Sequence, residues 1–272
     1  MLKPRAIFLD IDGTYASHGV VPPGHVDAVR AARAAGNLVL LCSGRPASAL
    51  PDSLTSAGFD GFVGAAGAYV RIGGKVLSDV RFPTELAART VSALDKHGML
   101  YILESPEGLF ARPGALGLIE RARRLYAGND DSAEARRTPI TSADNLHQVP
   151  FGKAVCLDGD TPIDEVVREI GPEVAVVTMS IEDAGSAAGE IYQSHLNKSV
   201  GMRIAMEHLG LTVDDIVAFG DGLNDLEMLQ FAGTSVAIEG SDPRVLAAAD
   251  RTAKGPQEEG LRAAFAELGL VG

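Results

Sequence analysis

Near the N-terminus, three short apolar runs alternate with segments of helical periodicity. The runs at residues 6–9, 38–42 and 61–63 have the length and composition of buried strands. Between them, residues 23–35 and 47–57 predict helices, and a glycine follows each one, where helices commonly end. Strand–helix–strand order at this spacing predicts right-handed parallel crossovers, with helices on both faces of a sheet.

The same order returns toward the C-terminus. An amphipathic helix is expected over residues 199–209, with Gly210 directly behind it. The next strands are expected at residues 216–219 and 235–238, and the next helices at residues 225–231, 243–249 and 257–268. The two ends of the chain therefore predict the two halves of one α/β core, a doubly wound and mostly parallel sheet.

The middle of the chain has a different pattern. Its predicted helices are 84–97, 115–126 and 163–170, its strands are 100–104, 109–112, 154–157 and 174–179, and residues 128–148 predict a polar loop. We expect an inserted α+β cap of residues 83–186 within a core of residues 1–82 and 187–272. The hinges are expected near residues 81–83 and 183–189.

Composition narrows the function classes. The 272 residues carry a net charge of −12, with 46% hydrophobic and 22% charged residues, which is ordinary for a globular protein and argues against general binding to nucleic acid or anionic membrane. No apolar run is long enough to predict a membrane helix or a signal peptide. The cysteines, Cys42 and Cys156, are too few for a disulfide framework. We therefore expect a cytoplasmic protein, as either a monomer or a homodimer.

Two carboxylates, Asp10 and Asp12, end the first predicted strand and are followed by Gly13 and Thr14. Side chains two residues apart on a strand point to the same side, and a glycine allows the chain to bend. The carboxyl edge of such a sheet is where open α/β folds bind ligands. Because like charges this close repel, a cation or a proton is needed between them. The pair predicts Mg²⁺-assisted chemistry with one nucleophilic and one acid/base carboxylate.

Two further segments offer groups for an anion. Ser43, Gly44 and Arg45 follow the second predicted strand and precede a helix, an arrangement that predicts an oxyanion cradle. Lys198 lies at the N-terminal end of an amphipathic helix, where a point cation can meet phosphoryl oxygens.

A fourth segment, residues 220–225, follows an apolar strand and opens a helix. We expect Asp221 and Asp225 at the same sheet edge as Asp10. Mg²⁺ prefers oxygen ligands and usually keeps some of its waters, so two or three carboxylates and a carbonyl would satisfy it.

In this order and spacing, the four segments resemble those of phosphatases of the haloacid dehalogenase (HAD) superfamily. The resemblance is to the Cof-like branch, which carries a large C2-type cap between the second and third motifs, and it covers nearly the whole chain. It implies a HAD-like Rossmannoid core. It also implies Mg²⁺-dependent hydrolysis of a small phosphorylated metabolite, such as a sugar phosphate, through an aspartyl-phosphate.

The resemblance implies a role for each motif residue. Asp10 would attack phosphorus, and Asp12 would protonate the leaving oxygen and then activate water. Lys198 would pair with Asp10 and hold phosphoryl oxygens. The other expected phosphate contacts are Ser43, Gly44, Arg45 and Asn224.

The implied Mg²⁺ ligands are the Asp10 and Asp221 carboxylates and the Asp12 backbone carbonyl, with Asp225 close by. Two positions depart from the common family pattern. Ala66 stands where relatives often have Asn, and Ser199 follows the lysine where they often have Gly. Both departures predict an altered fit for the substrate rather than loss of a catalytic group.

Two other functions stay open. One is a phosphotransferase that uses the same intermediate, and the other is a catalytically silent phosphate-binding regulatory protein. The complete set of acidic residues and the lysine argues against the silent protein. In the cap, we expect the basic residues Arg136, Arg137, His147 and Lys153 to form a solvated surface rather than a binding patch.

Overall fold

The structure is a computed structural model that describes residues 3–127, 138–178 and 185–271. Its contacts divide the chain into two units. The first comprises Met1–Arg45, Leu50–Asp79 and Asn197–Gly272, and the second comprises Pro46–Ala49 and Val80–Leu196. The predicted fold class, an α/β Rossmannoid core sheet with a second, inserted sheet, is confirmed. The predicted domain boundaries after residues 82 and 186 stay a prediction.

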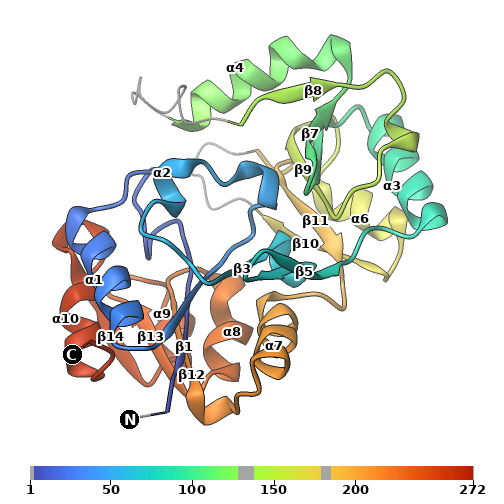
Figure 1. Ribbon diagram of the computed structural model, residues 1–272. Helices are drawn as coiled ribbons and strands as arrows, with labels where there is room; N and C mark the ends of the chain where they lie inside the picture. Colours follow the sequence, from blue (N-terminus) through green and yellow to red (C-terminus); the bar gives the residue numbers. More distant parts are fainter. Residues whose placement is uncertain (1–2, 128–137, 179–184, 272) are drawn as a thin grey trace. The chain divides into compact units, whose positions relative to one another are not determined.

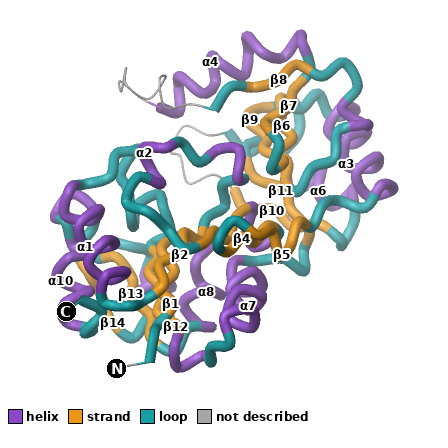
Figure 2. The backbone as a smooth tube through the Cα atoms, viewed as in Figure 1, coloured by secondary structure: helices purple, strands orange, loops and turns teal. Residues whose placement is uncertain are grey.

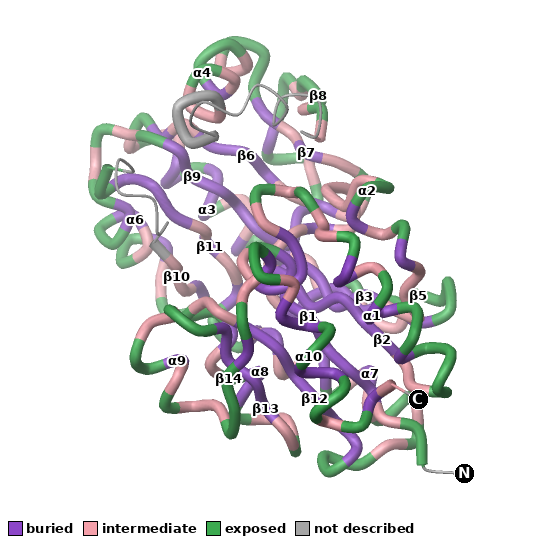
Figure 3. Tube along the Cα trace, turned by 90° about the vertical axis from the view of Figure 1, so that its left-hand side faces the viewer, coloured by how far each residue is buried: buried purple, intermediate pink, exposed green. Residues whose placement is uncertain are grey.

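The first unit is built on an eight-stranded sheet of order β14-β13-β12-β1-β2-β3-β4-β5 (Figure 1). At its centre, β1 (Ala6–Leu9) pairs in parallel with β12 (Ile216–Gly220) on one side and β2 (Leu38–Cys42) on the other. The remaining strands are β3 (Gly61–Gly64), β4 (Tyr69–Ile72), β5 (Lys75–Asp79), β13 (Thr234–Ile238) and β14 (Arg251–Ala253). The central strands are buried, as their apolar sequences predict (Figure 3).

Helices cover both faces of this sheet (Figure 2). Phe8 and Ala218 point toward the face that packs with α7, α8 and α9, whereas the neighbouring Phe219 lies with its ring 5.3 Å from that of Phe265 in α10 on the opposite face. The helix bounds are α1 (Pro23–Ala34), α2 (Asp52–Thr55), α7 (Lys198–Leu209), α8 (Leu226–Phe231), α9 (Pro243–Ala248) and α10 (Gly260–Glu267).

Two segments between β2 and the end of β5 differ from the sequence predictions. The helix expected over residues 47–57 is divided into a 3₁₀ turn, Ala47–Ala49, and α2. Pro51 lies between them with extended backbone. Proline lacks an N–H and disfavours helical backbone in the residue before it, so the predicted helix is interrupted there. The hairpin of β4 and β5 was not predicted, although its turn carries Gly73 and Gly74, both at positive φ.

The second unit is built on a six-stranded sheet of order β10-β11-β9-β6-β7-β8. Neighbouring strands run antiparallel, except that β7 and β8 are parallel. The bounds are β6 (Leu100–Ser105), β7 (Gly108–Ala111), β8 (Ile140–Ser142), β9 (Lys153–Asp158), β10 (Val174–Thr178) and β11 (Gly189–Gln193).

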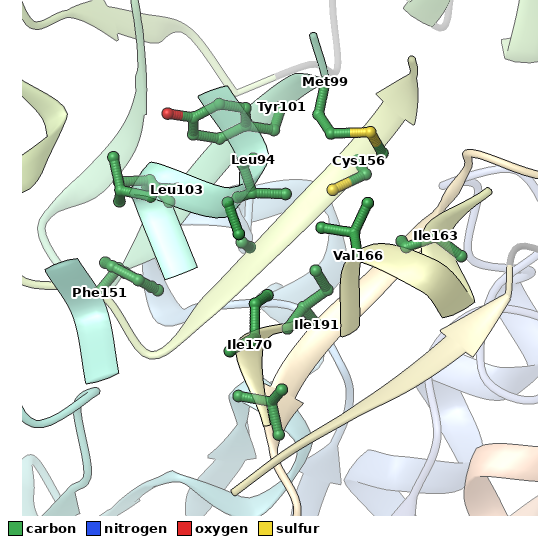
Figure 4. Packing of buried hydrophobic residues seen from close by; sticks show 14 of the residues in the cluster. Leu94, Met99, Tyr101, Leu103, Phe151, Cys156, Ile163, Val166, Ile170 and Ile191 are labelled. Atoms are coloured by element: carbon green, nitrogen blue, oxygen red, sulfur yellow. The ribbon is translucent and has the colours of Figure 1, made fainter. Parts of the chain in front are cut away.

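Alternation along β6 and β9 divides the apolar residues of this unit between two faces. Leu103 and Cys156 lie on the face covered by α3 (Thr84–Lys96) and α6 (Ile163–Ile170), whose packed interior is shown in Figure 4. Ile102 and Val155 belong to the cluster that includes Ile119 of α4 (Leu116–Ala127).

Part of the predicted polar loop 128–148 has regular secondary structure. It contains β8 and a 3₁₀ turn, Leu146–Gln148. The strand β11 is a further element that the sequence analysis did not predict. Residues 128–137 of that loop, with Arg136 and Arg137, lie outside the described residues, as do residue 179 and residues 183–184 of the predicted strand and hinge.

The expected solvated basic surface is wrong for Lys153, a residue that is 1% exposed. Both cysteines are free and buried. Among the helices that the structure describes, none has the length and apolar character needed to span a bilayer.

Candidate active site

The ends of β1 and β12 bring the first and fourth sequence segments together. The two strands are parallel neighbours, so their carboxyl ends lie at the same edge of the sheet. The Asp10 N–H donates to the Phe219 carbonyl at 3.0 Å, which extends the strand pairing to the aspartate itself. All nine of the predicted site residues belong to the first unit.

A buried ion-pair cluster forms the centre of this site. Lys198 Nζ lies 2.5 Å from Asp10 Oδ1 and also bonds to Asp225 Oδ1, and all three side chains are buried. Lys198 begins α7, where the Asn197 side chain accepts the Val200 N–H and so caps the helix. The backbone of the lysine is therefore fixed at the capped N-terminus of α7, while its ammonium group is bound by the two aspartates.

Asp225 is fully engaged by protein groups. Its Oδ1 accepts from Lys198, and its Oδ2 accepts the backbone N–H groups of Asp221 and Gly222 at 3.0 and 2.9 Å. This carboxylate both fixes the turn that carries Asp221 and holds the lysine.

Thr14 is a site residue that sequence reasoning missed. Its hydroxyl donates to Asp221 Oδ1 at 2.7 Å, so it orients that carboxylate across the two strand ends. In the sequence we assigned Thr14 only to the turn after Asp12, although its position in a two-aspartate segment was a usable signal. The neighbouring Gly13 has φ +96°, and a Cβ there would lie 2.2 Å from Asp221 Oδ2, so only glycine fits.

Asp12 and Arg45 form a bidentate ion pair. Arg45 Nε and Nη2 each donate to an Asp12 carboxylate oxygen at 2.8 Å, and about half of the Asp12 side chain is exposed. Ser43 is buried, and its Oγ accepts the Arg45 N–H at 3.2 Å. Gly44 lies in the same loop. Three of the predicted phosphate contacts, Ser43, Gly44 and Arg45, thus lie in one loop, and Arg45 joins that loop to Asp12. The fourth, Asn224, is exposed on the 3₁₀ turn Leu223–Asp225.

Ala66 and Ser199, the two departures from the family pattern, both have a structural account. Ala66 has φ +54°, in the left-handed region that asparagine tolerates better than alanine does. The chain is held close to α7 there, since a Cβ on Gly67 would lie 2.0 Å from the Asn197 carbonyl oxygen. Ser199 donates its hydroxyl to Asn197 Oδ1 at 2.6 Å and so supports the cap of that helix.

The electrostatics of the cluster favour a bound cation. Burial raises the pKa of Asp10 well above its ordinary value; Lys198 acts against this, and Asp225 and Asp221 add to it. Burial likewise raises the pKa of Asp221 to about 6, although the Thr14 hydrogen bond opposes the shift. Against the cost of burial, Asp10 and Asp225 raise the pKa of Lys198, which stays charged. Lys198 thus pairs with two of the three aspartates, and Asp221 adds a third acidic group without pairing to it.

The donor set fits a hard cation. Carboxylate oxygens of Asp10, Asp221 and Asp225 all lie within 4.8 Å of one another. Oxygen donors are those that Mg²⁺ prefers. An excess of buried negative charge at this edge would be offset by such an ion.

Comparison with known proteins agrees with this fold. The family model described as haloacid dehalogenase-like hydrolase matches residues 7–265. The chain is 26% identical to "Putative phosphatase YkrA" of Bacillus subtilis, over 99% of this chain and 100% of that protein. It is also 26% identical to the "Putative bifunctional phosphatase/peptidyl-prolyl cis-trans isomerase" of Streptococcus pyogenes, covering 99% of this chain but only 55% of that longer protein.

Among solved structures, the subclass IIB sugar phosphatase BT4131 superposes with a TM-score of 0.79 at 23% identity, over 98% of this chain and 100% of the other. An α/β core with an inserted cap sheet and an acidic site at the strand ends defines a capped hydrolase. The chain belongs to the haloacid dehalogenase-like hydrolases. The predicted superfamily and the predicted enzyme character are thereby confirmed, and the Cof-like branch stays a prediction.

Proposed function

We propose that this enzyme is a Mg²⁺-dependent phosphatase that hydrolyses a small phosphorylated metabolite through an aspartyl-phosphate. The observation that carries the proposal is the buried Asp10 carboxylate, paired with Lys198 at 2.5 Å and facing two further aspartates. The similarity of the fold to that of a sugar phosphatase supports a sugar phosphate or a related ester as substrate.

In the proposed reaction, an Asp10 carboxylate oxygen attacks phosphorus, and the bond from phosphorus to the ester oxygen breaks. Asp12 supplies a proton to that leaving oxygen and then takes a proton from the attacking water, which releases phosphate and restores Asp10. The buried Lys198 pairs with Asp10 and with the phosphoryl oxygens. Ser43, with the Gly44 backbone beside it, contacts the same oxygens.

The residues that would hold Mg²⁺ are Asp10 and Asp221 through their carboxylates and Asp12 through its carbonyl. When bound, the ion would offset the negative charge of the phosphoryl group. Both oxygens of Asp225 already accept hydrogen bonds from protein groups. We therefore propose that Asp225 acts on the site by orienting Lys198 and Asp221.

The ion pair of Arg45 with Asp12 bears on the acid/base step. Both Asp12 carboxylate oxygens accept hydrogen bonds from Arg45, so the pair occupies the atoms that would contact the ester oxygen. We propose that Arg45 turns to a substrate phosphoryl oxygen, as the sequence predicts, and so leaves the Asp12 carboxyl group free to contact the leaving oxygen.

The first test is hydrolysis of p-nitrophenyl phosphate by the wild type and by Asp10→Asn, with Mg²⁺ and with EDTA. Asp52→Asn is the matched control, because Asp52 is exposed on α2. We expect activity that requires both Asp10 and Mg²⁺ and is unaffected in the control. Substantial activity in clean Asp10→Asn protein would overturn the mechanism.

Measuring p-nitrophenol and inorganic phosphate together separates the two alternative functions. A phosphatase releases both in equal amounts. A phosphotransferase given an acceptor alcohol releases more p-nitrophenol than phosphate. A silent binding protein releases neither product with any phosphate ester, while still binding inorganic phosphate.

A further inference from the structure

His25 is a fully buried histidine whose two ring nitrogens both contact backbone atoms. It lies in the first turn of α1. Nδ1 is 2.9 Å from the carbonyl oxygen of Tyr15, and Nε2 is 3.2 Å from the N–H of Leu261 at the start of α10. The imidazole therefore joins the start of α1 to the loop before it and to the distant start of α10.

These two partners fix the protonation of the ring. A backbone carbonyl can only accept, so Nδ1 must carry a proton, and a backbone N–H can only donate, so Nε2 must present a lone pair. His25 is thus a neutral imidazole in the Nδ1–H tautomer. Leu261 N–H is one of the unpaired donors of a helix N-terminus, so Nε2 satisfies a group that would otherwise be buried without a partner.

The surroundings support a neutral ring. Burial lowers the pKa of His25, while the Tyr15 carbonyl and the Glu259 carboxylate oppose the shift. The Glu259 carboxylate is itself engaged, since its Oε1 accepts the Gly24 N–H at 3.2 Å. Tyr15 stacks on the imidazole with ring centroids 6.3 Å apart, and burial raises the pKa of its phenol to about 12, so it too is neutral.

Tyr15 connects this anchor to the residues of the proposed reaction. The loop of residues 10–20, here named the nucleophile loop, folds back on itself: Tyr15 N–H donates to the Asp10 carbonyl at 3.1 Å, and Gly13 N–H donates to the Ala16 carbonyl at 2.8 Å. Asp12 lies inside this fold. A displacement of the Tyr15 carbonyl would therefore move Asp12 relative to Asp10.

We infer that His25 is a positioning residue, which holds the nucleophile loop through the Tyr15 carbonyl and so places Asp12 for proton transfer to the leaving oxygen. The inference rests on the proposed function. His25 itself is buried beneath the loop and acts only through its two backbone partners.

Because the proposed role of His25 is to place the proton donor Asp12, its loss should change kcat/KM to a different extent for different leaving groups. Phenoxide is a poorer leaving group than p-nitrophenoxide and needs the proton more. A misplaced Asp12 should therefore lower kcat/KM for phenyl phosphate more than for p-nitrophenyl phosphate. A variant that merely reduces the folded fraction lowers both values by the same factor.

The variants follow from the geometry. His25→Phe keeps a ring beside Tyr15 but removes both hydrogen bonds, whereas His25→Gln retains a neutral donor and a neutral acceptor. His208→Gln is the matched control, because His208 is exposed in the last turn of α7. We expect His25→Phe to lose at least about tenfold in kcat/KM for phenyl phosphate, as for a general acid displaced from its position. The loss for p-nitrophenyl phosphate should be smaller, His25→Gln should recover part of it, and the control should match the wild type.

The tautomer is tested without reference to activity, by the ¹⁵N chemical shifts of the imidazole in labelled wild-type protein. We expect the Nδ1–H tautomer at neutral pH, and an Nε2–H tautomer or a cationic ring would overturn the inference. Equal kcat/KM losses for the two esters in His25→Phe would overturn the positioning role. If His25→Phe does not fold, His25→Gln and the tautomer decide. If the wild type hydrolyses neither ester, the proposed function fails and the positioning role with it, while the shifts still test the anchor.

Discussion

Lys198 in the first unit and Lys153 in the second are both buried lysines that lie between two carboxylates. Lys198 pairs with Asp10 and Asp225, and Lys153 lies 3.1 Å from Glu104 Oε2 and 2.9 Å from Glu190 Oε2. Each lysine is 1% exposed. Composition and burial alone would therefore assign them the same role.

Their positions in the two sheets differ. Glu104, Lys153 and Glu190 lie on three neighbouring strands, β6, β9 and β11, so Lys153 is held by cross-strand pairs of one antiparallel sheet. Lys198 and its partners lie beyond the carboxyl ends of parallel strands, together with a third acid, Asp221. The charges around Lys153 stabilise the second sheet. The cluster around Lys198 instead keeps an excess of negative charge at the strand ends, where a cation and a substrate can bind.

The largest expected difference between the two lysines is in activity. We expect Lys198→Met to lower kcat/KM for p-nitrophenyl phosphate about 10³-fold, because it removes a preorganised charge at the phosphoryl oxygens. Lys153→Met should stay close to the wild type, measured with the same ester. An equal loss in both variants would show that burial between acids, rather than position at the strand ends, governs the effect.

The second difference concerns stability. Lys153→Met leaves the partly buried side chains of Glu104 and Glu190 without their cation and should lower the free energy of unfolding by about 1–3 kcal/mol, measured by urea denaturation. The triple variant Lys153→Met/Glu104→Gln/Glu190→Gln should recover most of that loss, since no partly buried carboxylate then lacks its cation. A triple variant no more stable than the single one would contradict a role for these charges in the sheet.

A smaller difference between the two clusters is expected in the effect of Mg²⁺ on the stability of the protein. A cation that binds only the folded protein stabilises it by about 2.7 kcal/mol at a hundredfold excess over its Kd. We expect Mg²⁺ to raise the melting temperature of the wild type and of Lys153→Met, and to have little effect on Asp221→Asn. A full Mg²⁺ response in Asp221→Asn would remove that residue from the proposed ligand set.

The smallest effect is expected at an exposed lysine. Lys3 donates to Asp215, and this hydrogen bond, with two from Thr212, lowers the pKa of Asp215 to about 2. A lowered pKa means that the contribution to stability is present above the ordinary pKa of an aspartate and is lost as the pH falls toward 2. In Lys3→Met the pKa of Asp215 should rise toward its ordinary value, as followed by ¹³C NMR titration. An unchanged pKa would assign the shift to Thr212 alone.

The contrast between the two lysines also explains what the sequence could predict. The strands of the core were predictable because β1, β2 and β12 are continuous apolar runs, and polar groups at the ends of parallel strands meet at one edge whatever the detailed register. Lys153 could not be assigned, because its partners depend on the register of three strands, one of which, β11, was not predicted.

The same reasoning applies within the site. The spacing of Asp10 and Asp12 was enough to predict that both side chains point to one site. The contact of Thr14 with Asp221 could not be predicted, because it depends on how two loops meet. For Arg45 the sequence predicted a phosphate contact, but a pairing with an acid agrees equally well with its position after β2. The structure shows the pairing with Asp12, and the phosphate contact stays a prediction.

The central claim is that the Asp10 carboxylate becomes phosphorylated. The most direct measurement is to acid-quench the enzyme during turnover of p-nitrophenyl phosphate, reduce it with borohydride, and locate the product by peptide mass spectrometry. An acyl phosphate is reduced to an alcohol, so the account predicts homoserine at position 10, dependent on both substrate and Mg²⁺. Reduction at another residue, or none in an enzyme that turns over, would contradict it.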